Sequence, residues 1–272
     1  MQIDARDGTS IPARQEISVP ARQRLVWQVL VDTLASITID GASPSVLDCG
    51  GGSGSFAVPL AQVGALVTVV DISVDALATL HRRAGEAGMA ERVRPVQGDV
   101  ESLAEAVAPG SFDLVLAHGI LEAVDHVGTA FAGISAAVGD GGLLSVLVGN
   151  PVAGVFARAI SGEFAAALAE LRSLDAPSPT VDSAGSAGTV RSASPAPRAS
   201  ATPDEVRRLC TAAGLVIEQT HGVGVFSELV PGVALDVPGA AEALAELEAA
   251  AAVREPLCEI ASRVHILARR RD

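Results

Sequence analysis

The chain has 272 residues, of which 49% are hydrophobic, and this length and composition suit one large globular domain over residues 1–272 rather than a disordered protein. Its formal net charge of -13 predicts a surface that repels nucleic acid and anionic membranes, so any contact with RNA has to come from a local basic patch. The sequence shows no signal core, no membrane-spanning run and no Cys/His metal motif, so we expect a reduced, cytoplasmic protein without a metal or a membrane contact.

The first expected helix runs from about Pro20 to Ile37 and has apolar residues at helical spacing. The segment Ser45–Ser55 follows, where a short apolar run ends in Asp48, and glycines at 50, 51, 52 and 54 lead into a helix at Phe56–Val63. Glycines reach backbone conformations closed to other residues, and the helix start offers unpaired N–H groups. This strand, turn and helix predict a site for an anionic or dipolar ligand.

A second apolar run, Val67–Asp71, ends in an acid about 20 residues after the first glycine, where a carboxylate can bind both hydroxyls of a ribose. Ser73 is expected to cap a helix through about Ala87, and a third strand at Arg92–Val96 precedes Gly98-Asp99-Val100. From the residues alone, Asp99 can cap a helix that starts near residue 101. The strand before the glycine loop, the loop itself and the strand that ends in Asp71 together predict a site for a nucleoside cofactor.

The fourth expected strand, Ser111–His118, places His118 at a carboxyl end of the sheet, where ligands of open α/β sheets bind. His118 and the nearby Glu122 are therefore candidates for the wall of the cofactor or substrate site, although a lone histidine is as readily structural. A helix at Val127–Val138, a turn at residues 139–142 and a fifth strand at Leu143–Val148 complete the parallel half of the sheet.

The remainder of the chain adds an insert, a linker and the antiparallel end of the sheet. Pro151–Leu174 is expected to be a helical insert with one apolar face, and its position after the fifth strand suggests a lid. Residues 175–202 are rich in Ser, Ala, Pro and Gly and predict a flexible low-complexity linker. Then follow a helix closed by Gly214, a strand at Leu215–Thr220, a helix at Ala240–Ala252 and a strand at Arg263–Arg269.

The spacing Asp-x-Gly-x-Gly-x-Gly from Asp48 resembles motif I of the class I S-adenosylmethionine-dependent methyltransferases. The resemblance implies a Rossmann-like α/β fold with a seven-stranded mixed sheet, helices on both faces and a helical lid insert. It also implies that S-adenosylmethionine is the cofactor, that Asp48 orients its methionine end, that Asp71 binds its ribose, and that Asp99 and Val100 hold its adenine.

From Arg22 onward the chain resembles a narrower group, the SmtA-like tRNA 5-carboxymethoxyuridine methyltransferases. The shared features include Asp48-Cys-Gly-Gly-Gly, Asp71-Ile-Ser, His118 with Leu121-Glu122, Thr202-Pro-Asp and Arg254-Glu-Pro256 with His265. This resemblance implies cofactor contacts from the following residues: Arg22 to the carboxylate, Gly50 and Gly51 to the methionine backbone, Asp71 and Ile72 to the ribose and adenine, Val100 to the adenine edge, and His118. Gly52 is a further predicted cofactor contact in the same loop.

The substrate end departs from that group. Gly224 stands where those relatives usually have an arginine, Leu257 stands where they favour a tyrosine, and Ser262-Arg263 replaces their Arg-Tyr pair. Each loss removes a contact to phosphate, base or carboxylate. These losses weaken the hypothesis that tRNA is the substrate, but they do not affect the prediction that S-adenosylmethionine is the cofactor. Arg254 and Arg263 are the candidate substrate-binding residues that remain.

The sequence thus predicts an S-adenosylmethionine-dependent methyltransferase, and three hypotheses differ in what it acts on. In the first, the methyl acceptor is the carboxylate of 5-carboxymethoxyuridine in tRNA. In the second, the acceptor is a small-molecule metabolite. In the third, the protein binds the cofactor without catalysis. A carboxylate acceptor needs no general base, whereas a hydroxyl or amine acceptor could use His118 or Glu122. An NAD-dependent dehydrogenase is a weaker alternative, because the spacing Gly-x-Gly-x-x-Gly/Ala is met only in part by Ser55.

Overall fold

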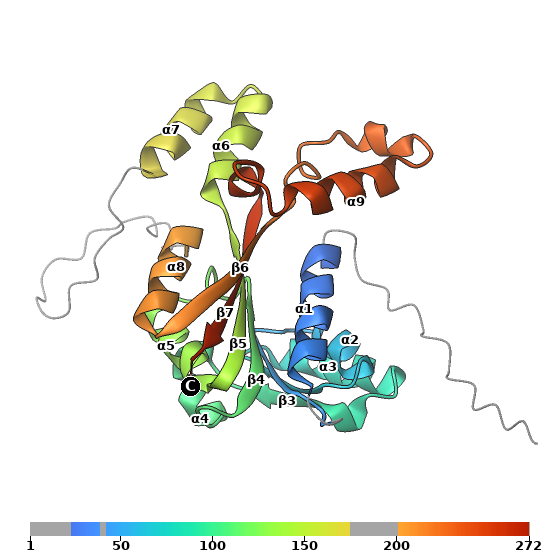
Figure 1. Ribbon diagram of the computed structural model, residues 1–272, viewed down its shortest axis with the longest axis vertical. Coiled ribbons are helices and arrows are strands. Elements are labelled where there is room, and N and C mark those ends of the chain that lie inside the picture. The colour runs from blue at the N-terminus through green and yellow to red at the C-terminus, as the bar shows by residue number, and fades with distance from the viewer. Residues whose placement is uncertain (1–22, 39–41, 175–200, 272) are drawn as a thin grey trace, which may run out of the picture.

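The computed structural model describes residues 23–38, 42–174 and 201–271, and its centre is one mixed sheet. Seven strands lie in the order β3-β2-β1-β4-β5-β7-β6, and β7 runs antiparallel to both of its neighbours. Figure 1 shows this twisted sheet with helices on both sides. The expected seven-stranded mixed sheet with two helical layers is confirmed. The strands are β1 (Ser45–Cys49), β2 (Leu66–Asp71), β3 (Val93–Gln97), β4 (Phe112–His118), β5 (Val138–Gly149), β6 (Leu215–Val223) and β7 (Arg263–Arg270).

Two hydrophobic cores, one on each face of the sheet, hold the helices in place. On one face lie α1 (Arg24–Ile37), α2 (Ala57–Gln62) and α3 (Val74–Glu86), whose buried residues pack with inward-facing leucines of β4 and β5. On the other face lie α4 (Leu103–Ala106), α5 (Val127–Ala137) and α8 (Pro203–Ala212) (Figure 1). The central strands are buried on both faces, which is why β1 is an almost continuous apolar run rather than an alternating one.

Helix starts follow the capping chemistry of the sequence. The Ser73 hydroxyl accepts a hydrogen bond from the backbone N–H of Ala76 at the start of α3, at 3.2 Å. The Thr202 hydroxyl does the same for Glu205 in α8, where Pro203 occupies the first turn. Short 3-10 turns fill the remaining connections: η2 (Ala90–Arg92), η3 (Val100–Ser102), η4 (Gly232–Asp236) and η5 (Leu257–Ile260).

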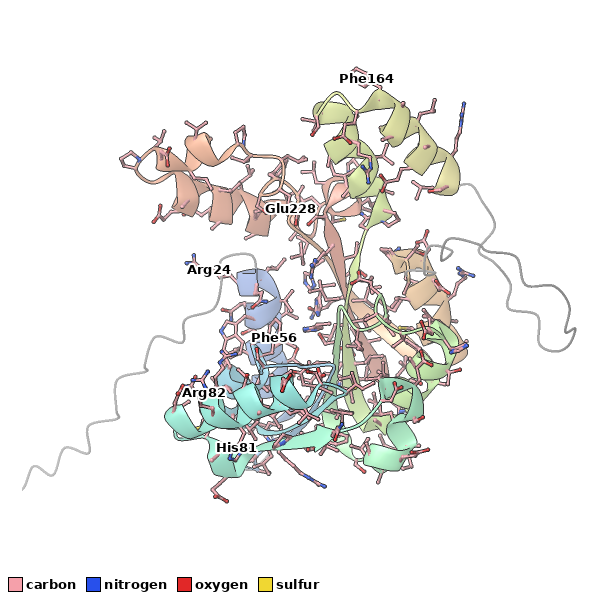
Figure 2. All side chains as sticks on the ribbon, turned by 180° about the vertical axis from the view of Figure 1, so that it is seen from behind. Arg24, Phe56, His81, Arg82, Phe164 and Glu228 are labelled. Atoms are coloured by element: carbon pink, nitrogen blue, oxygen red, sulfur yellow. The ribbon has the colours of Figure 1, made fainter. Side chains whose placement is uncertain are left out.

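Two helical segments project beyond the carboxyl ends of β1, β2 and β4. One is the pair α6 (Pro151–Ile160) and α7 (Phe164–Leu174), and the other contains η4 and α9 (Ala240–Ala251) (Figure 1). The expected helical insert is therefore two helices joined at Gly162, and Phe164 lies at its outer end (Figure 2). Its apolar side chains are largely exposed rather than buried: Phe156 is 43% exposed, Ile160 65%, Phe164 71%, Leu168 46% and Leu171 48%. Its role as a lid stays a prediction.

The beginning of β5 differs from the expectation. The sequence predicts a turn at residues 139–142, but the strand starts at Val138 and the register against β4 shifts between Phe112 and Leu114. A side chain at Gly142 would put its Cβ 3.0 Å from the Phe112 carbonyl oxygen, so the glycines allow this irregular strand to pass close to its neighbour. The start of the predicted first helix and residues 175–200 of the predicted linker lie outside the described residues. Within the described ranges, no helix has the length and apolarity that crossing a membrane requires.

Candidate functional site

The glycine loop after β1 is held against β2 by its backbone. The Gly50 N–H donates to the Val70 carbonyl at 2.7 Å, and Gly50 has a φ of 68°, a conformation that side chains disfavour. A Cβ on Gly51 would lie 2.4 Å from Oδ2 of Asp48, which is closer than two such atoms can approach. The spacing of acid and glycines therefore reflects a loop that folds directly over the Asp48 carboxyl group.

Burial changes the chemistry of Asp48. Its side chain is only 3% exposed, and this burial, together with the charge of nearby Asp71, raises the pKa of the Asp48 carboxyl to about 7. A carboxyl group with this pKa is partly protonated near neutrality, and a cation bound beside it would favour its ionised form. The position thus suits the positive end of a ligand.

Asp71 is fixed by two backbone donors at the carboxyl end of β2. Its Oδ2 accepts from the Gly52 N–H at 2.9 Å, and its Oδ1 accepts from the Ser73 N–H at 2.8 Å. A carboxylate has about four lone-pair positions, so both oxygens retain the capacity to accept from a diol. The glycine loop and the second strand therefore orient this carboxylate before any ligand arrives.

A cavity of about 300 Å³ lies between the glycine loop, the end of β2 and the segment after β4. Its walls include five of the predicted cofactor residues, namely Gly50, Asp71, Ile72, Asp99 and Val100. Ile72 is 70% exposed and lines the cavity, so its apolar side chain is available to a ligand bound there. Three other predicted residues do not line the cavity, namely Asp48, Gly51 and Gly52. They support its wall instead: Gly52 donates to Asp71, and Gly51 packs against the Asp48 carboxyl group.

The far wall of the cavity comes from residues that the sequence analysis missed. Ile120, Ala123 and Val124 follow β4, and Glu101 lies in η3. The Glu101 carboxylate accepts from the backbone N–H groups of Asp125 and His126 at 2.6 and 2.8 Å, which ties the segment after β4 to the segment after β3. The only sequence signal for the residues of this far wall is that they follow the carboxyl end of a strand. Asp99 also has the simpler role, since its Oδ1 accepts from the Glu101 N–H at 2.9 Å and caps η3.

His118 and Glu122 lie at the carboxyl end of β4, but neither lines this cavity. His118 Nε2 is 2.8 Å from the Ser145 Oγ, and its ring meets the edge of Phe56 with centroids 4.9 Å apart. Burial lowers the pKa of His118 to about 3. Glu122 accepts a hydrogen bond from the backbone N–H of Gly149 and thereby joins the ends of β4 and β5. Their roles in catalysis stay predictions.

Of the predicted arginines, the two that the structure describes, Arg254 and Arg263, do not line this cavity. Arg22 lies outside the described residues. Arg254 and Arg263 are exposed, and Arg263 begins β7 beside Gly149, at the end of β5. Gly224 has a φ of 73°, and a Cβ there would be 2.5 Å from Oγ of Ser262. The backbone of this chain is therefore unsuited to an arginine at position 224.

Residues 47–146 match the family model described as a methyltransferase domain. This matched segment contains the glycine loop, Asp71 and every described residue that lines the cavity. Its sequence is similar to the release factor glutamine methyltransferase of Chlorobaculum tepidum, with 43% identity over 99 residues, or 35% of this chain and 33% of the relative. It is also similar to the ubiquinone biosynthesis O-methyltransferase of Azorhizobium caulinodans, with 36% identity over 117 residues, or 43% of this chain and 45% of the relative. The chain thus matches less than half the length of either relative.

Solved structures extend the likeness of the fold beyond the matched segment. The magnesium protoporphyrin IX methyltransferase of Synechocystis PCC 6803 superposes with a TM-score of 0.56 over 92% of this chain and 84% of its own, at 16% identity. The cyclase SpnF does so with a TM-score of 0.54 over 92% and 83%, at 20% identity. These likenesses confirm the Rossmann-like class I methyltransferase fold. One fold here carries two different reactions, so the acceptor has to be argued from the site.

Proposed function

We propose that this protein is an S-adenosylmethionine-dependent methyltransferase. The observation that carries the proposal is the Asp71 carboxylate, which two backbone N–H groups hold at a cavity walled by Ile72 and Val100, inside a methyltransferase domain. Asp71 would accept from the two ribose hydroxyls, while the apolar side chains would cover the adenine faces. A solved neighbour, geranyl diphosphate methyltransferase, was determined in complex with this cofactor and has a TM-score of 0.54.

When bound, S-adenosylmethionine supplies a methyl group that positive sulfur already activates, so the protein contributes mainly position and a dry environment. The glycine loop would hold the methionine part of the ligand with its backbone. Asp48, under the loop, would provide negative charge for the cationic end, and ligand binding would lower its raised pKa and release a proton. The predicted contact of Arg22 to the cofactor carboxylate belongs to this proposal as well.

For the acceptor, we infer a small apolar molecule. Both segments that project beyond the sheet expose apolar side chains, such as Ile160 and Phe164 in one and Val233 and Val237 in the other, at 61 to 73% exposure. The net charge of -13 disfavours a polyanionic acceptor. Relatives named ubiquinone biosynthesis O-methyltransferase, at 34 to 36% identity, support an acceptor of this class.

Methyl esterification of 5-carboxymethoxyuridine in tRNA is the second candidate. Arg263 favours it, because this exposed cation lies beside Gly149 at the carboxyl end of β5, where it could bind a substrate carboxylate. Gly224 argues against it, because the arginine that the tRNA-modifying relatives use at this position would meet Ser262. Binding of the cofactor without methyl transfer is the third outcome that an experiment has to separate.

The test combines binding with methyl transfer. Calorimetry should detect S-adenosylmethionine but not NAD, and Asp71→Asn should weaken binding about tenfold or more because a charge-assisted contact is lost. The matched control is Asp75→Asn, which removes an exposed acid in the first turn of α3 and should leave affinity within about twofold. Tight NAD binding without binding of S-adenosylmethionine would refute the cofactor assignment.

The acceptor is tested with S-adenosylmethionine that carries a tritiated methyl group. We expect label in the organic-soluble fraction of a small-molecule extract and none in total tRNA. Label in tRNA that is lost in Arg263→Ala would replace the first candidate with the second. Cofactor binding without label in either fraction would favour the non-catalytic alternative.

A further inference from the structure

A chain of buried polar side chains crosses four adjacent strands behind the candidate site. His118 Nε2 on β4 is 2.8 Å from Ser145 Oγ on β5, and the same Oγ is 2.8 Å from His265 Nε2 on β7. His265 Nδ1 is in turn 3.2 Å from His221 Nδ1 on β6. The last two rings are within 24° of coplanar with centroids 5.4 Å apart, which fits two imidazoles bonded edge to edge.

All four side chains project from the face of the sheet that α1 and α2 cover. Side chains alternate along a strand, so His118 lies on the same face as Leu116, and Ser145 on the same face as Leu147. Both leucines belong to the core that contains α1 and α2. Phe56, which precedes α2 at the end of the glycine loop, contacts the His118 ring. His118, at one end of this row of side chains, is thus next to the glycine loop. His221, at the other end, is on β6, the outermost strand.

The two ends differ from the middle in their surroundings. Ser145 and His265 are 0% exposed, whereas His221 is 8% exposed. At the other end, His118 Nδ1 is shielded from solvent and has no hydrogen-bonding partner among residues 23–38, 42–174 and 201–271. A buried polar atom without a partner is rare in folded proteins and needs an explanation. His118 does not itself line the cofactor cavity, but Ile120, two residues further along the chain, does. A role in proton transfer therefore requires the acceptor to reach past Ile120 to this nitrogen.

When all three histidines are neutral, these four hydrogen-bonded side chains have only two possible arrangements of their protons. The Ser145 hydroxyl has one hydrogen, so it donates to one histidine and accepts from the other. If it donates to His265, then His118 carries its proton on Nε2, His265 on Nδ1 and His221 on Nε2. If it donates to His118, all three tautomers are reversed. The tautomer of His118 is therefore the same as that of His221 and opposite to that of His265.

We propose that His118, Ser145, His265 and His221 form a proton relay, which removes the proton that a hydroxyl or amine acceptor loses when it is methylated. This inference rests on the proposed function and narrows its acceptor to a group that carries a hydrogen. A carboxylate is already ionised and would have no use for such a path.

The transfer balances without any further reactant. The acceptor's oxygen or nitrogen uses its lone pair to bond the methyl carbon, the pair of the broken bond stays on the leaving sulfur, and the released proton goes to His118 Nδ1. His118 passes its Nε2 proton to Ser145, which passes its own to His265 Nε2. His265 gives its Nδ1 proton to His221, and His221 releases its Nε2 proton to solvent. Each side chain ends neutral, with the tautomers reversed.

The environment explains why a relay is needed rather than a single base. Burial lowers the pKa of His118, and burial together with its two histidine neighbours lowers that of His265 well below the usual value. A buried imidazolium is therefore unfavourable, but a neutral imidazole can accept a proton on one nitrogen while it releases one from the other. Burial also lowers the pKa of His221, which favours release of the proton at the edge of the sheet.

The relay predicts a spectroscopic signature that does not depend on activity. In the full-length protein labelled with 15N-histidine, the Nδ1 and Nε2 shifts report the tautomer of each of the five histidines. At neutral pH, His118 and His221 should have equal tautomer populations, and His265 the complementary one. Tautomer populations of His118 and His265 that are not complementary, or a charged imidazolium at any of the three positions, would overturn the relay. This result needs no variant, so it stands even if a substitution prevents folding.

A variant then tests the coupling and the role. Ser145→Ala should change the tautomer population of His118, while the control Ser135→Ala, which removes another buried hydroxyl, should change none. With a hydroxyl acceptor, Ser145→Ala should slow methyl transfer by about 100-fold and reduce its solvent isotope effect, with cofactor affinity unchanged. An unchanged rate, or an unchanged His118 tautomer, would refute the relay. If the cofactor binds but no acceptor is found, the proposed function fails, and the wild-type tautomers still decide whether the relay exists.

Discussion

The buried carboxyl group of Asp48 predicts a specific dependence of stability on pH. In the folded protein its pKa is about 7, against 3.8 for an ordinary aspartate, so between these values the folded state holds a proton that the unfolded chain releases. The free energy of unfolding therefore falls as pH rises through this window and levels off above pH 7. From about pH 5.5 to about pH 8, this single group should remove about 2 kcal/mol, at about 1.36 kcal/mol per pKa unit.

Asp48→Asn removes the titration while it retains the shape of the side chain. We expect urea unfolding at both pH values to give a stability difference between variant and wild type that grows by about 2 kcal/mol from about pH 5.5 to about pH 8. Asp75→Asn is the control, because that carboxylate is exposed in the first turn of α3. The same variant should bind S-adenosylmethionine more weakly, since it lacks the charge beside the cationic end. A difference that is constant with pH would refute the reasoning.

Three further predictions concern the loop, position 224 and the adenine wall. Gly51→Ala should lower the free energy of unfolding by about 1–3 kcal/mol because its Cβ meets a carboxylate oxygen, whereas Gly85→Ala, in open space near the end of α3, should be neutral or stabilising. Gly224→Arg should destabilise the fold by about 1–3 kcal/mol in the same assay and add no tRNA methylation; a stable variant that methylates tRNA would contradict this. Ile72→Ser should weaken cofactor binding about tenfold with little change in melting temperature, because this exposed side chain would be covered by the ligand. Val74→Ser, at 58% exposure, is its control, and an equal effect of both variants on affinity would contradict the assignment.

The cofactor end of the site could be predicted from the sequence because its parts are local. The acid of β1, the glycines after it and the acid that ends β2 lie within 24 residues, from Asp48 to Asp71, and the apolar runs between them indicate parallel strands. Parallel neighbours align their carboxyl ends, so Asp71 has to meet the glycine loop, as its hydrogen bond with Gly52 confirms. Conformations that depend on nearby residues can be inferred from patterns of nearby residues.

The tertiary structure alone decided which distant side chains meet. Ser145 and His265 are 120 residues apart, and His221 and His265 are 44 apart, yet the register of β5, β6 and β7 brings them into one hydrogen-bonded chain. A one-residue shift of any strand would turn its member to the opposite face of the sheet, and no local periodicity fixes that register between strands so far apart in sequence. The same reason applies to the far wall of the cavity, which the Glu101 carboxylate assembles from two separate loops. Local sequence patterns determined where the strands lie along the chain and which functional residues follow them. Long-range packing determined which side chains of different strands face one another.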